Sequence, residues 1–353
     1  MTSHASRLDE LGWRSFFSAQ LSDAEVAQCV PVRVMAVHRG FIAVAGDGVE
    51  TLMPSQIPGA DGEEDRPAAG DWLLLARESH EPVRLLRRAN LFKRLAAGVR
   101  QRLQVIAANV DTLFVVASCN DDFNIARLER YLVLARDVDV TPVVVLTKTD
   151  LVDAWEPFAE AARALQPDLI VQAVNARDPQ SVAALAKWCG PGQTVAFLGS
   201  SGVGKSTLIN TLRGSDTLAT GAIREDDGKG RHTTTAREMH RLEGGGWLLD
   251  TPGMRELQLS EVASGIAEVF DDIVSLAQEC RFSNCTHEAE PGCRIVEAID
   301  GGSLDPARLA RWRKLATEEA ANSASNTTRK ARIAGRVSAA PQPSNRNGRR
   351  PRR

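Results

Sequence analysis

The sequence predicts an α/β fold with a mainly parallel sheet, preceded by an all-β domain and followed by a small, mainly helical domain. Between residues 102 and 258, fully apolar runs alternate with helical patterns, which is typical of strands buried on both faces of a parallel sheet. Before residue 95, short β-rich runs are separated by turn residues, as in a small barrel. After residue 259, three cysteines and a histidine lie close together in a mostly helical segment, which indicates a small domain held by a metal ion.

Length and composition exclude several classes of protein. The chain has 353 residues, more than one domain usually holds, an ordinary composition and a formal net charge of -2. It has no run of about 18 apolar residues that could span a bilayer, and its first residues lack the layout of a signal peptide. We therefore expect a cytoplasmic protein with no membrane partner, acting as a monomer.

We divide the N-terminal part into a helical extension over 1–27 and an all-β barrel over 28–95. Residues 7–21 have the spacing of a short amphipathic helix. Turn residues such as Arg39-Gly40 separate the strands of the barrel. We expect these strands at Val32–Val37, Phe41–Ala45, Thr51–Met53 and Trp72–Leu75.

The segment 102–258 shows the alternation of strands and helices of an α/β domain. Its strands are expected at Thr112–Ala117, Pro142–Thr147, Leu169–Val174, Thr194–Gly199 and Trp247–Asp250. Its helices are expected at Ile125–Arg136, Trp155–Leu165, Ser181–Trp188 and Lys205–Arg213.

The C-terminal part consists of a helical domain over 259–318 and a tail over 319–353. Ala, Ser, Asn, Pro and Arg dominate the tail without apolar periodicity, so it cannot bury enough surface to offset its ordering entropy, and we expect disorder. Its uniform charge favours non-specific phosphate binding. Every charged residue after Glu319 is basic: Arg329, Lys330, Arg332, Arg336, Arg346, Arg349, Arg350, Arg352 and Arg353.

Residues 199–206 fit the pattern G-x-x-x-x-G-K-[ST] and lie between an apolar strand and a helical segment, where a phosphate-binding loop must lie. The glycines let backbone N–H groups converge on phosphates, and the Ser206 hydroxyl can ligate Mg²⁺. Lys205 supplies positive charge to the β- and γ-phosphates, which also makes it a candidate catalytic residue. The expected nucleotide contacts are Gly199, Ser200, Ser201, Gly202, Val203, Gly204, Lys205, Ser206 and Thr207.

A second phosphate-side motif, Asp-Thr-Pro-Gly, occupies residues 250–253 after an apolar strand. Asp250 can hold Mg²⁺ through water, and the N–H of Gly253 can bond the γ-phosphate. Such a turn is common by itself, and its position downstream of Lys205 favours the role at a metal ion.

The base is indicated by Thr147-Lys148-Thr149-Asp150, which follows an apolar strand. The Asp150 carboxylate can accept both the N1–H and the exocyclic N2–H of guanine, whereas adenine does not offer this pair of donors. The motif resembles the [NT]-K-x-D sequence of Ras-like GTPases, with Thr147 where Asn is commoner. Asn175 and Ala176 stand where such GTPases read guanine O6 through the backbone, and a plain surface turn is the alternative.

The order of these motifs is unusual. The guanine motif at 147–150 precedes the phosphate-binding loop and Asp250, whereas the usual order places it last. A cyclic shift of the chain gives this order, and it is feasible because domain termini often lie close together. We therefore expect a circularly permuted P-loop GTPase domain that binds GTP with Mg²⁺.

The cysteine cluster suits a metal ion. Cys280, Cys285, His287 and Cys293 offer three thiolates and one imidazole, a closed tetrahedral set for Zn²⁺. In a cytosolic protein such a cluster indicates metal instead of disulfides. We expect one structural zinc ion that stabilises the small domain, and unligated core cysteines are the alternative.

Together these motifs resemble the circularly permuted, ribosome small-subunit-dependent GTPases of the RsgA (YjeQ/EngC-type) family. The resemblance implies an N-terminal OB-fold, a permuted G domain, a C-terminal zinc domain, and GTP hydrolysis stimulated by the small (30S) ribosomal subunit during its late maturation. It implies 16S rRNA as a partner of the OB-fold, the zinc domain and the tail. The matching segments are 104–111, 123–131, 230–235, 280–287 and 290–293.

The resemblance also assigns roles in the segment 230–235. Thr234, in preference to Thr233, would complete the Mg²⁺ shell, with Thr233 beside the nucleotide. His232 resembles a residue that positions the attacking water, and a solvent-facing loop histidine is the alternative. Met254 stands where Ras-like enzymes carry a water-orienting Gln, and a thioether holds water weakly, so we expect slow hydrolysis until a partner stimulates it.

Other interpretations are open for the arginines and for the activity. The arginines that follow the barrel could track an RNA backbone, with a solvated charged face as the alternative. A metabolic P-loop kinase or ATPase is disfavoured by Asp150, and an RNA-binding scaffold with a vestigial nucleotide site is disfavoured by the retention of Lys205 and Asp250. The basic residues concerned are Arg84, Arg87, Arg88, Lys93, Arg94, Arg100 and Arg102.

Overall fold

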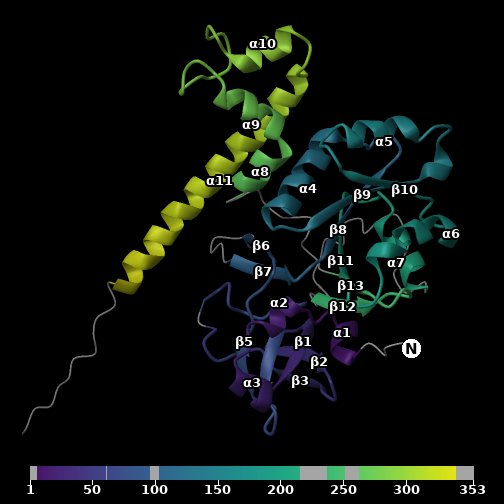
Figure 1. Ribbon diagram of the computed structural model, residues 1–353, viewed down its shortest axis with the longest axis vertical. Coiled ribbons are helices and arrows are strands. Elements are labelled where there is room, and N and C mark those ends of the chain that lie inside the picture. Colours follow the sequence, from purple (N-terminus) through teal and green to yellow (C-terminus); the bar gives the residue numbers. More distant parts are fainter. Residues whose placement is uncertain (1–5, 61, 96–102, 215–236, 251–261, 339–353) are drawn as a thin grey trace, which may run out of the picture.

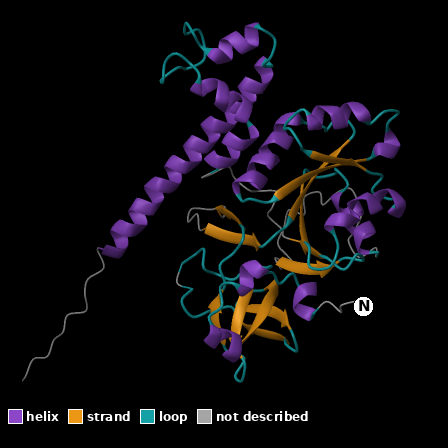
Figure 2. Cartoon of the chain, in the orientation of Figure 1, coloured by secondary structure: helices purple, strands orange, loops and turns teal. Residues whose placement is uncertain are grey.

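The computed structural model describes residues 6–60, 62–95, 103–214, 237–250 and 262–338. An N-terminal β region lies at one end of the molecule, the α/β domain lies beside it, and the C-terminal helices lie at the other end (Figure 1). Figure 2 shows that the strands belong to the first two parts and that the third is helical. No described helix combines the length and the hydropathy that crossing a bilayer requires.

The N-terminal extension forms three short helices, so the expected single helix over 7–21 is wrong. The chain turns at Gly12, which has φ +89° and therefore favours glycine. A Cβ there would lie 2.7 Å from the carbonyl oxygen of Gly192, so this turn also permits close contact with the α/β domain. The helices are α1 (Arg7–Glu10), α2 (Ser15–Ser18) and α3 (Asp23–Gln28).

The N-terminal β region is a twisted antiparallel sheet in the order β3-β2-β1-β4-β5. Alternate residues of these strands, among them Val32, Ile42 and Leu73, form its apolar core. No pairing between β3 and β5 closes this sheet within the described residues. The strands are β1 (Cys29–Val37), β2 (Phe41–Gly46), β3 (Glu50–Pro54), β4 (Trp72–Ala76) and β5 (Pro82–Leu85), followed by the hairpin β6 (Leu91–Leu95) and β7 (Leu103–Ala108).

The α/β domain contains a parallel sheet in the order β10-β9-β8-β11-β13, with β12 antiparallel beside β13. Every residue of β8 and β11 is buried, which confirms the expectation of strands covered on both faces. The expected strand ranges agree with the structure to within a residue or so. The strands are β8 (Thr112–Ser118), β9 (Thr141–Thr147), β10 (Ile170–Ala173), β11 (Thr194–Leu198), β12 (Arg237–Arg241) and β13 (Trp247–Asp250).

Helices cover both faces of this sheet. Leu113 and Val115 of β8 share an apolar cluster with α4 and α5, whereas Phe114 and Val116 share one with α6, η2 and α7. The alternation follows from the two-residue period of a strand. The helices are α4 (Ile125–Asp137), α5 (Glu156–Arg163), α6 (Pro179–Val182) and α7 (Lys205–Arg213), with 3₁₀ turns η1 (Thr149–Leu151) and η2 (Ala183–Trp188).

The β region and the α/β domain are joined by a continuous sheet and by a buried arginine. Strand β12 pairs antiparallel with β1, so hydrogen bonding continues from one part into the other. The guanidinium of Arg33, which is 2% exposed, donates to the carbonyls of Leu11, Gly70 and Asn109 and to the Thr194 hydroxyl at 2.8 Å. Burial lowers the pKa of Arg33 to about 10, so the group stays charged at neutral pH.

The C-terminal helices pack on α4, and the last of them is longer than expected. Helix α11 continues to Ser338, so the expectation of disorder is wrong for residues 319–338, while residues 339–353 lie outside the described residues. The hydrogen bonds of a helix are local, and Ala, Arg and Lys have high helix propensity, so a helix does not need apolar periodicity to continue. The helices are α8 (Ala263–Val269), α9 (Asp271–Gln278), α10 (Arg294–Asp300) and α11 (Pro306–Ser338).

Candidate functional site

The motifs separated in the sequence meet at one edge of the parallel sheet. Because the strands are parallel, their carboxyl ends lie together, which is where open α/β sheets bind ligands. The guanine motif begins at Thr147, the last residue of β9, and Asp250 ends β13. Residues 175 and 176 follow β10, and residues 199–206 follow β11. The guanine motif and the phosphate-binding loop therefore lie on the same side of the sheet.

The phosphate-binding loop has the backbone of an anion site. Gly204 has φ +94° and caps the N-terminus of α7, so the unpaired N–H groups of that helix face the loop. The ammonium group of Lys205 is largely buried and donates to the carbonyls of Gly199, at 2.7 Å, and Ser200. Ser206 is partly exposed in the first turn of α7. A bound phosphate could take the place of these two carbonyls at Lys205.

Thr147 connects the guanine motif to the phosphate-binding loop. Its buried hydroxyl lies within hydrogen-bonding distance of the carbonyls of Val203 and Ala117, the latter at 3.2 Å. A Cβ on Gly204 would lie 3.3 Å from the same hydroxyl, which shows how closely the two loops approach. The substitution of Thr for the commoner Asn therefore preserves a direct bond between the loops.

The Asp150 carboxylate is presented to solvent. Lys148 adopts the left-handed conformation with φ +58°, which turns the chain out of the buried strand β9 into the 3₁₀ turn. Asp150 is exposed within that turn, and Thr149 is partly exposed. Asp150 is therefore available to accept hydrogen bonds from an incoming base.

The loop after β10 is held against the helix that follows the phosphate-binding loop. The side-chain oxygen of Asn175 accepts from the N–H of Arg177 at 3.0 Å, so this side chain shapes its own turn. The hydroxyl of Thr211 in α7 donates to the Ala176 carbonyl at 2.7 Å. The loop is thus fixed next to the guanine motif, and the N–H of Asn175 donates to the Ser181 hydroxyl at 2.9 Å.

Part of the expected site lies outside the described residues. This holds for Gly253 and Met254, and for His232, Thr233 and Thr234. Asp250, partly exposed at the end of β13, and Thr207, partly exposed in α7, are described.

One residue next to the site was missed by the sequence analysis. The guanidinium of Arg127, in the first turn of α4, donates through Nη1 to the hydroxyl of Ser200 at 2.7 Å. The feature of the sequence that could have indicated it is a positive charge three residues after the N-cap Asn124, where the helix dipole makes a cation unfavourable.

The cysteine cluster has the geometry of a zinc site. The ligand atoms of its four residues lie within 4.8 Å of one another. The Nδ1 atom of His287 lies 3.6 Å from the sulfur atoms of both Cys280 and Cys293, and those sulfurs are 3.9 Å apart. A tetrahedron with Zn–S of about 2.3 Å has edges of about 3.8 Å, so the donor set Cys280, Cys285, His287 and Cys293 fits Zn²⁺.

The loop that carries these ligands is ordered by Glu290 and by α11. The Glu290 carboxylate accepts from the backbone N–H groups of Thr286 at 2.6 Å and of Glu288 at 3.0 Å, and hydrogen bonds from Thr286 hold the pKa of Glu290 well below its usual range. Arg313 of α11 donates to the His287 carbonyl at 2.8 Å, and the ring of Trp312 packs against that of His287. The cluster thus joins α9, α10 and α11.

Several basic residues expected to contact RNA form ion pairs or hydrogen bonds within the protein. Arg84 pairs with Glu25 at 2.7 Å, and Arg88 pairs with the buried Asp71 at 2.7 Å. The expected phosphate-tracking strip is therefore wrong for Arg84 and Arg88, whose charges are neutralised. Arg87 is exposed over the ring of Phe16. Lys93 pairs with Glu64 and Arg94 bonds Gln104, while Arg100 and Arg102 lie outside the described residues.

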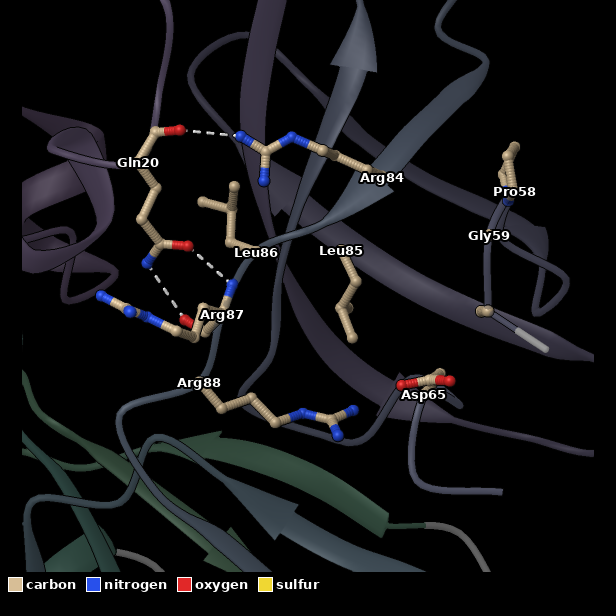
Figure 3. A pocket seen from close by; sticks show the side chains of 10 residues that line it. Gln20, Pro58, Gly59, Asp65, Arg84, Leu85, Leu86, Arg87 and Arg88 are labelled. Atoms are coloured by element: carbon tan, nitrogen blue, oxygen red, sulfur yellow. Dashed lines mark hydrogen bonds between the residues drawn. The ribbon is translucent and has the colours of Figure 1, made fainter. Parts of the chain in front are cut away.

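Arg84, Arg87 and Arg88 line a cavity of about 520 Å³ in the β region. Figure 3 shows Gln20 at one side of this cavity. Its side chain forms two hydrogen bonds with the backbone of Arg87, and its backbone carbonyl accepts from Arg84. Arg84 and Arg88 already have acidic partners, so their charges are not available to an anion in this cavity. This cavity lies in the N-terminal β region and contains none of the predicted nucleotide contacts.

The fold and the order of its site motifs define a circularly permuted P-loop GTPase. A family model described as RsgA GTPase matches residues 85–260. The small ribosomal subunit biogenesis GTPase RsgA of Mesorhizobium japonicum is 50% identical over 325 residues, covering 91% of this chain and 92% of the relative. The chain belongs to the RsgA family of GTPases.

A further curated relative agrees with this membership, and two solved structures are similar in fold. RsgA 2 of Vibrio parahaemolyticus is 46% identical, over 92% of this chain and 89% of the relative. The crystal structure of YjeQ from Thermotoga maritima has a TM-score of 0.58 at 22% identity, covering 81% of this chain and 97% of that one. That of YloQ, described as a circularly permuted GTPase, has a TM-score of 0.57 at 23% identity, covering 82% and 94%. The two structures share the fold.

Proposed function

We propose that the chain binds GTP at the carboxyl edge of the parallel sheet and hydrolyses it to GDP and phosphate. The observation that supports this most directly is the contact of the Thr147 hydroxyl with the Val203 carbonyl, which fixes the base-reading loop to the phosphate-binding loop. Asp150 accepts the N1–H and N2–H of guanine, and Asn175 and Ala176 border the base. Lys205 exchanges its two backbone carbonyls for phosphate oxygens.

Hydrolysis requires a metal ion and an oriented water. Ser206 and Asp250 are the described residues that would hold Mg²⁺, which would neutralise charge on the phosphates when bound. We assign the other roles from the family resemblance: Thr234 completes the metal shell, and His232 positions the attacking water. Gly253 and Thr233 contact the nucleotide.

The Cys/His cluster is proposed to hold one structural zinc ion. Cys280 follows α9 and Cys293 is the N-cap of α10, so shared ligation fixes these helices to each other. With four protein ligands no position remains for a substrate. We keep 259–318 as the zinc domain, 102–258 as the G domain, and 28–95 as an OB-fold after the extension 1–27.

We propose that the chain acts in the cytoplasm as a monomer that assists late maturation of the small ribosomal subunit. The curated relatives are small ribosomal subunit biogenesis GTPases, and they cover about nine tenths of the chain. 16S rRNA is the proposed partner of the β region, of the zinc domain and of the basic segment 319–353. Binding of the subunit would supply the orientation of the attacking water that the thioether of Met254 cannot provide.

The test is the rate of GTP hydrolysis by the full chain with and without purified 30S subunits. The proposal predicts slow turnover alone and a rise of roughly 10³-fold with subunits, the range seen when a partner supplies transition-state stabilisation. Lys205→Ala should abolish both rates. Equal rates with and without subunits would contradict the ribosomal role, and unchanged turnover in Lys205→Ala would contradict the site.

A further inference from the structure

Helix α4 begins at the phosphate-binding loop. Asn124 caps it by accepting from the N–H of Arg127 at 3.0 Å, so Arg127 sits in the first turn, where a cation is unfavourable beside the helix dipole. Its guanidinium is exposed, yet it donates to Ser200 at 2.7 Å. The carbonyl of the same Ser200 accepts from Lys205. The charge of Arg127 is therefore electrostatically unfavourable at the N-terminus of α4, yet Arg127 forms a specific hydrogen bond to the phosphate-binding loop.

The next turn of the same helix is bound to α11. Glu129 is 0% exposed, and its carboxylate accepts from Arg308 at 3.2 Å and from Arg311 at 2.7 Å. Burial raises the pKa of Glu129, and these guanidinium groups oppose that rise. Arg130 donates two hydrogen bonds to Glu318, at 2.6 and 2.7 Å. Arg127, which contacts the loop, therefore lies only two and three positions before Glu129 and Arg130, which contact α11.

The contact between α4 and the C-terminal helices permits little sliding. A Cβ on Gly265 of α8 would lie 2.2 Å from the carbonyl oxygen of Val133, so the two backbones touch. Leu128 and Val133 of α4 are packed in the same buried cluster as Ile266 of α8. Any shift of α11 along α4 would also leave the buried Glu129 charge without its partners, which is strongly unfavourable. The helices α4, α8 and α11 should therefore move together.

We propose that α4 couples the position of α11 to the phosphate-binding loop, with Arg127 as the positioning residue at the loop end and the Arg130–Glu318 pair at the other end. A partner that displaces α11 would move α4, and through Arg127 it would move Ser200 and the carbonyl that binds Lys205. This inference deepens the proposed function, because it states how a subunit bound to the C-terminal helices alters GTP turnover and GDP release.

The experiment uses the full chain in two assays: dissociation of a fluorescent GDP, and GTP hydrolysis with and without 30S subunits. Arg127→Gln and Ser200→Ala should each change GDP dissociation by about threefold or more, and the double variant should match the single ones, since both remove one bond. Arg127→Lys should restore part of the effect. Glu318→Gln should keep the basal kcat and KM and lose about threefold or more of the stimulation by subunits.

Arg136→Gln is the matched control, because it removes an α4 ion pair with Glu268 of α8 that reaches neither α11 nor the loop. It should leave the stimulation unchanged. Additive effects of Arg127→Gln and Ser200→Ala would overturn the role of Arg127, and full stimulation in Glu318→Gln would overturn the role of the Arg130–Glu318 pair in the coupling. If the unmodified chain shows no GTP turnover with or without subunits, the proposed function is wrong. This result differs from those that contradict only the coupling.

Discussion

The hydroxyl of Thr147 reaches the carbonyl of Val203, so a strand-end residue of the guanine motif is bonded to the interior of the phosphate-binding loop. The two residues are 56 positions apart, and both are buried. In the permuted chain the guanine motif comes first. Because β8 pairs in parallel with both β9 and β11, the motif still lies next to the phosphate-binding loop. The permutation changes the connections and leaves the site intact.

Removing this hydroxyl should weaken nucleotide binding. Thr147→Val has a similar shape and leaves the Val203 carbonyl without its donor, so we expect the Kd for GTP to rise roughly tenfold. Isothermal titration measures this change. Thr141→Val, at the exposed start of the same strand, is the control and should bind GTP normally. An unchanged Kd in Thr147→Val would show that the contact does not support binding.

The buried Arg33 should stabilise the junction between the β region and the α/β domain. Arg33→Met leaves the carbonyls of Leu11 and Asn109 without a charged donor, so we expect the free energy of unfolding to fall by about 3 kcal/mol. Denaturant unfolding checks this value. The exposed Arg39→Met should change it by less than about 0.5 kcal/mol, and equal effects of the two substitutions would argue against the junction.

Zinc should be required by the C-terminal domain and not by the nucleotide site. Cys285→Ser should lose the bound metal, whereas Cys29→Ala, a buried cysteine of the β region, should keep about one zinc ion per chain. Elemental analysis of the purified variants measures the metal, and GTP binding should persist in both. Full zinc content in Cys285→Ser would remove that residue from the ligand set.

The Glu25 carboxylate should stay ionised in acid. The hydrogen bond from Arg84, together with those from Ser22, lowers the pKa of Glu25 to about 2 from 4.5. Its stabilising contribution is therefore complete above pH 4.5 and is lost as the pH falls through about 2. NMR titration should find the carboxylate still ionised near pH 3 in the unmodified chain, with the midpoint raised toward 4.5 in Arg84→Gln, where the hydrogen bonds from Ser22 remain. A midpoint near 4.5 in both would contradict the pairing.

The sequence predicts features that depend on local spacing. The phosphate-binding loop, the guanine motif and the Cys/His cluster each occupy a short segment, and the parallel strands then dictate that the first two share an edge. The cyclic order of the motifs was sufficient to predict the permutation, because the order does not depend on tertiary contacts.

Features that depend on distant partners were not predictable in this way. Arg33 and Thr194 lie 161 positions apart, and Arg127 and Ser200 lie 73 apart, so no local pattern links them. The charge of Arg84 favours an RNA contact in the sequence, because the sequence does not show that Glu25 is its ion-pair partner. The continuation of helix α11 beyond residue 319 does not follow from apolar periodicity, because a helix can continue without it.

Base selectivity tests the central claim most directly. Competition of GTP, ATP and xanthosine triphosphate should be measured on the unmodified chain and on Asp150→Asn. We predict strong preference for GTP in the first; the amide offers one donor and one acceptor, so the variant should lose preference for guanine and favour xanthine. ATP binding as tightly as GTP, or strict GTP selectivity retained in Asp150→Asn, would contradict the assignment of the guanine site.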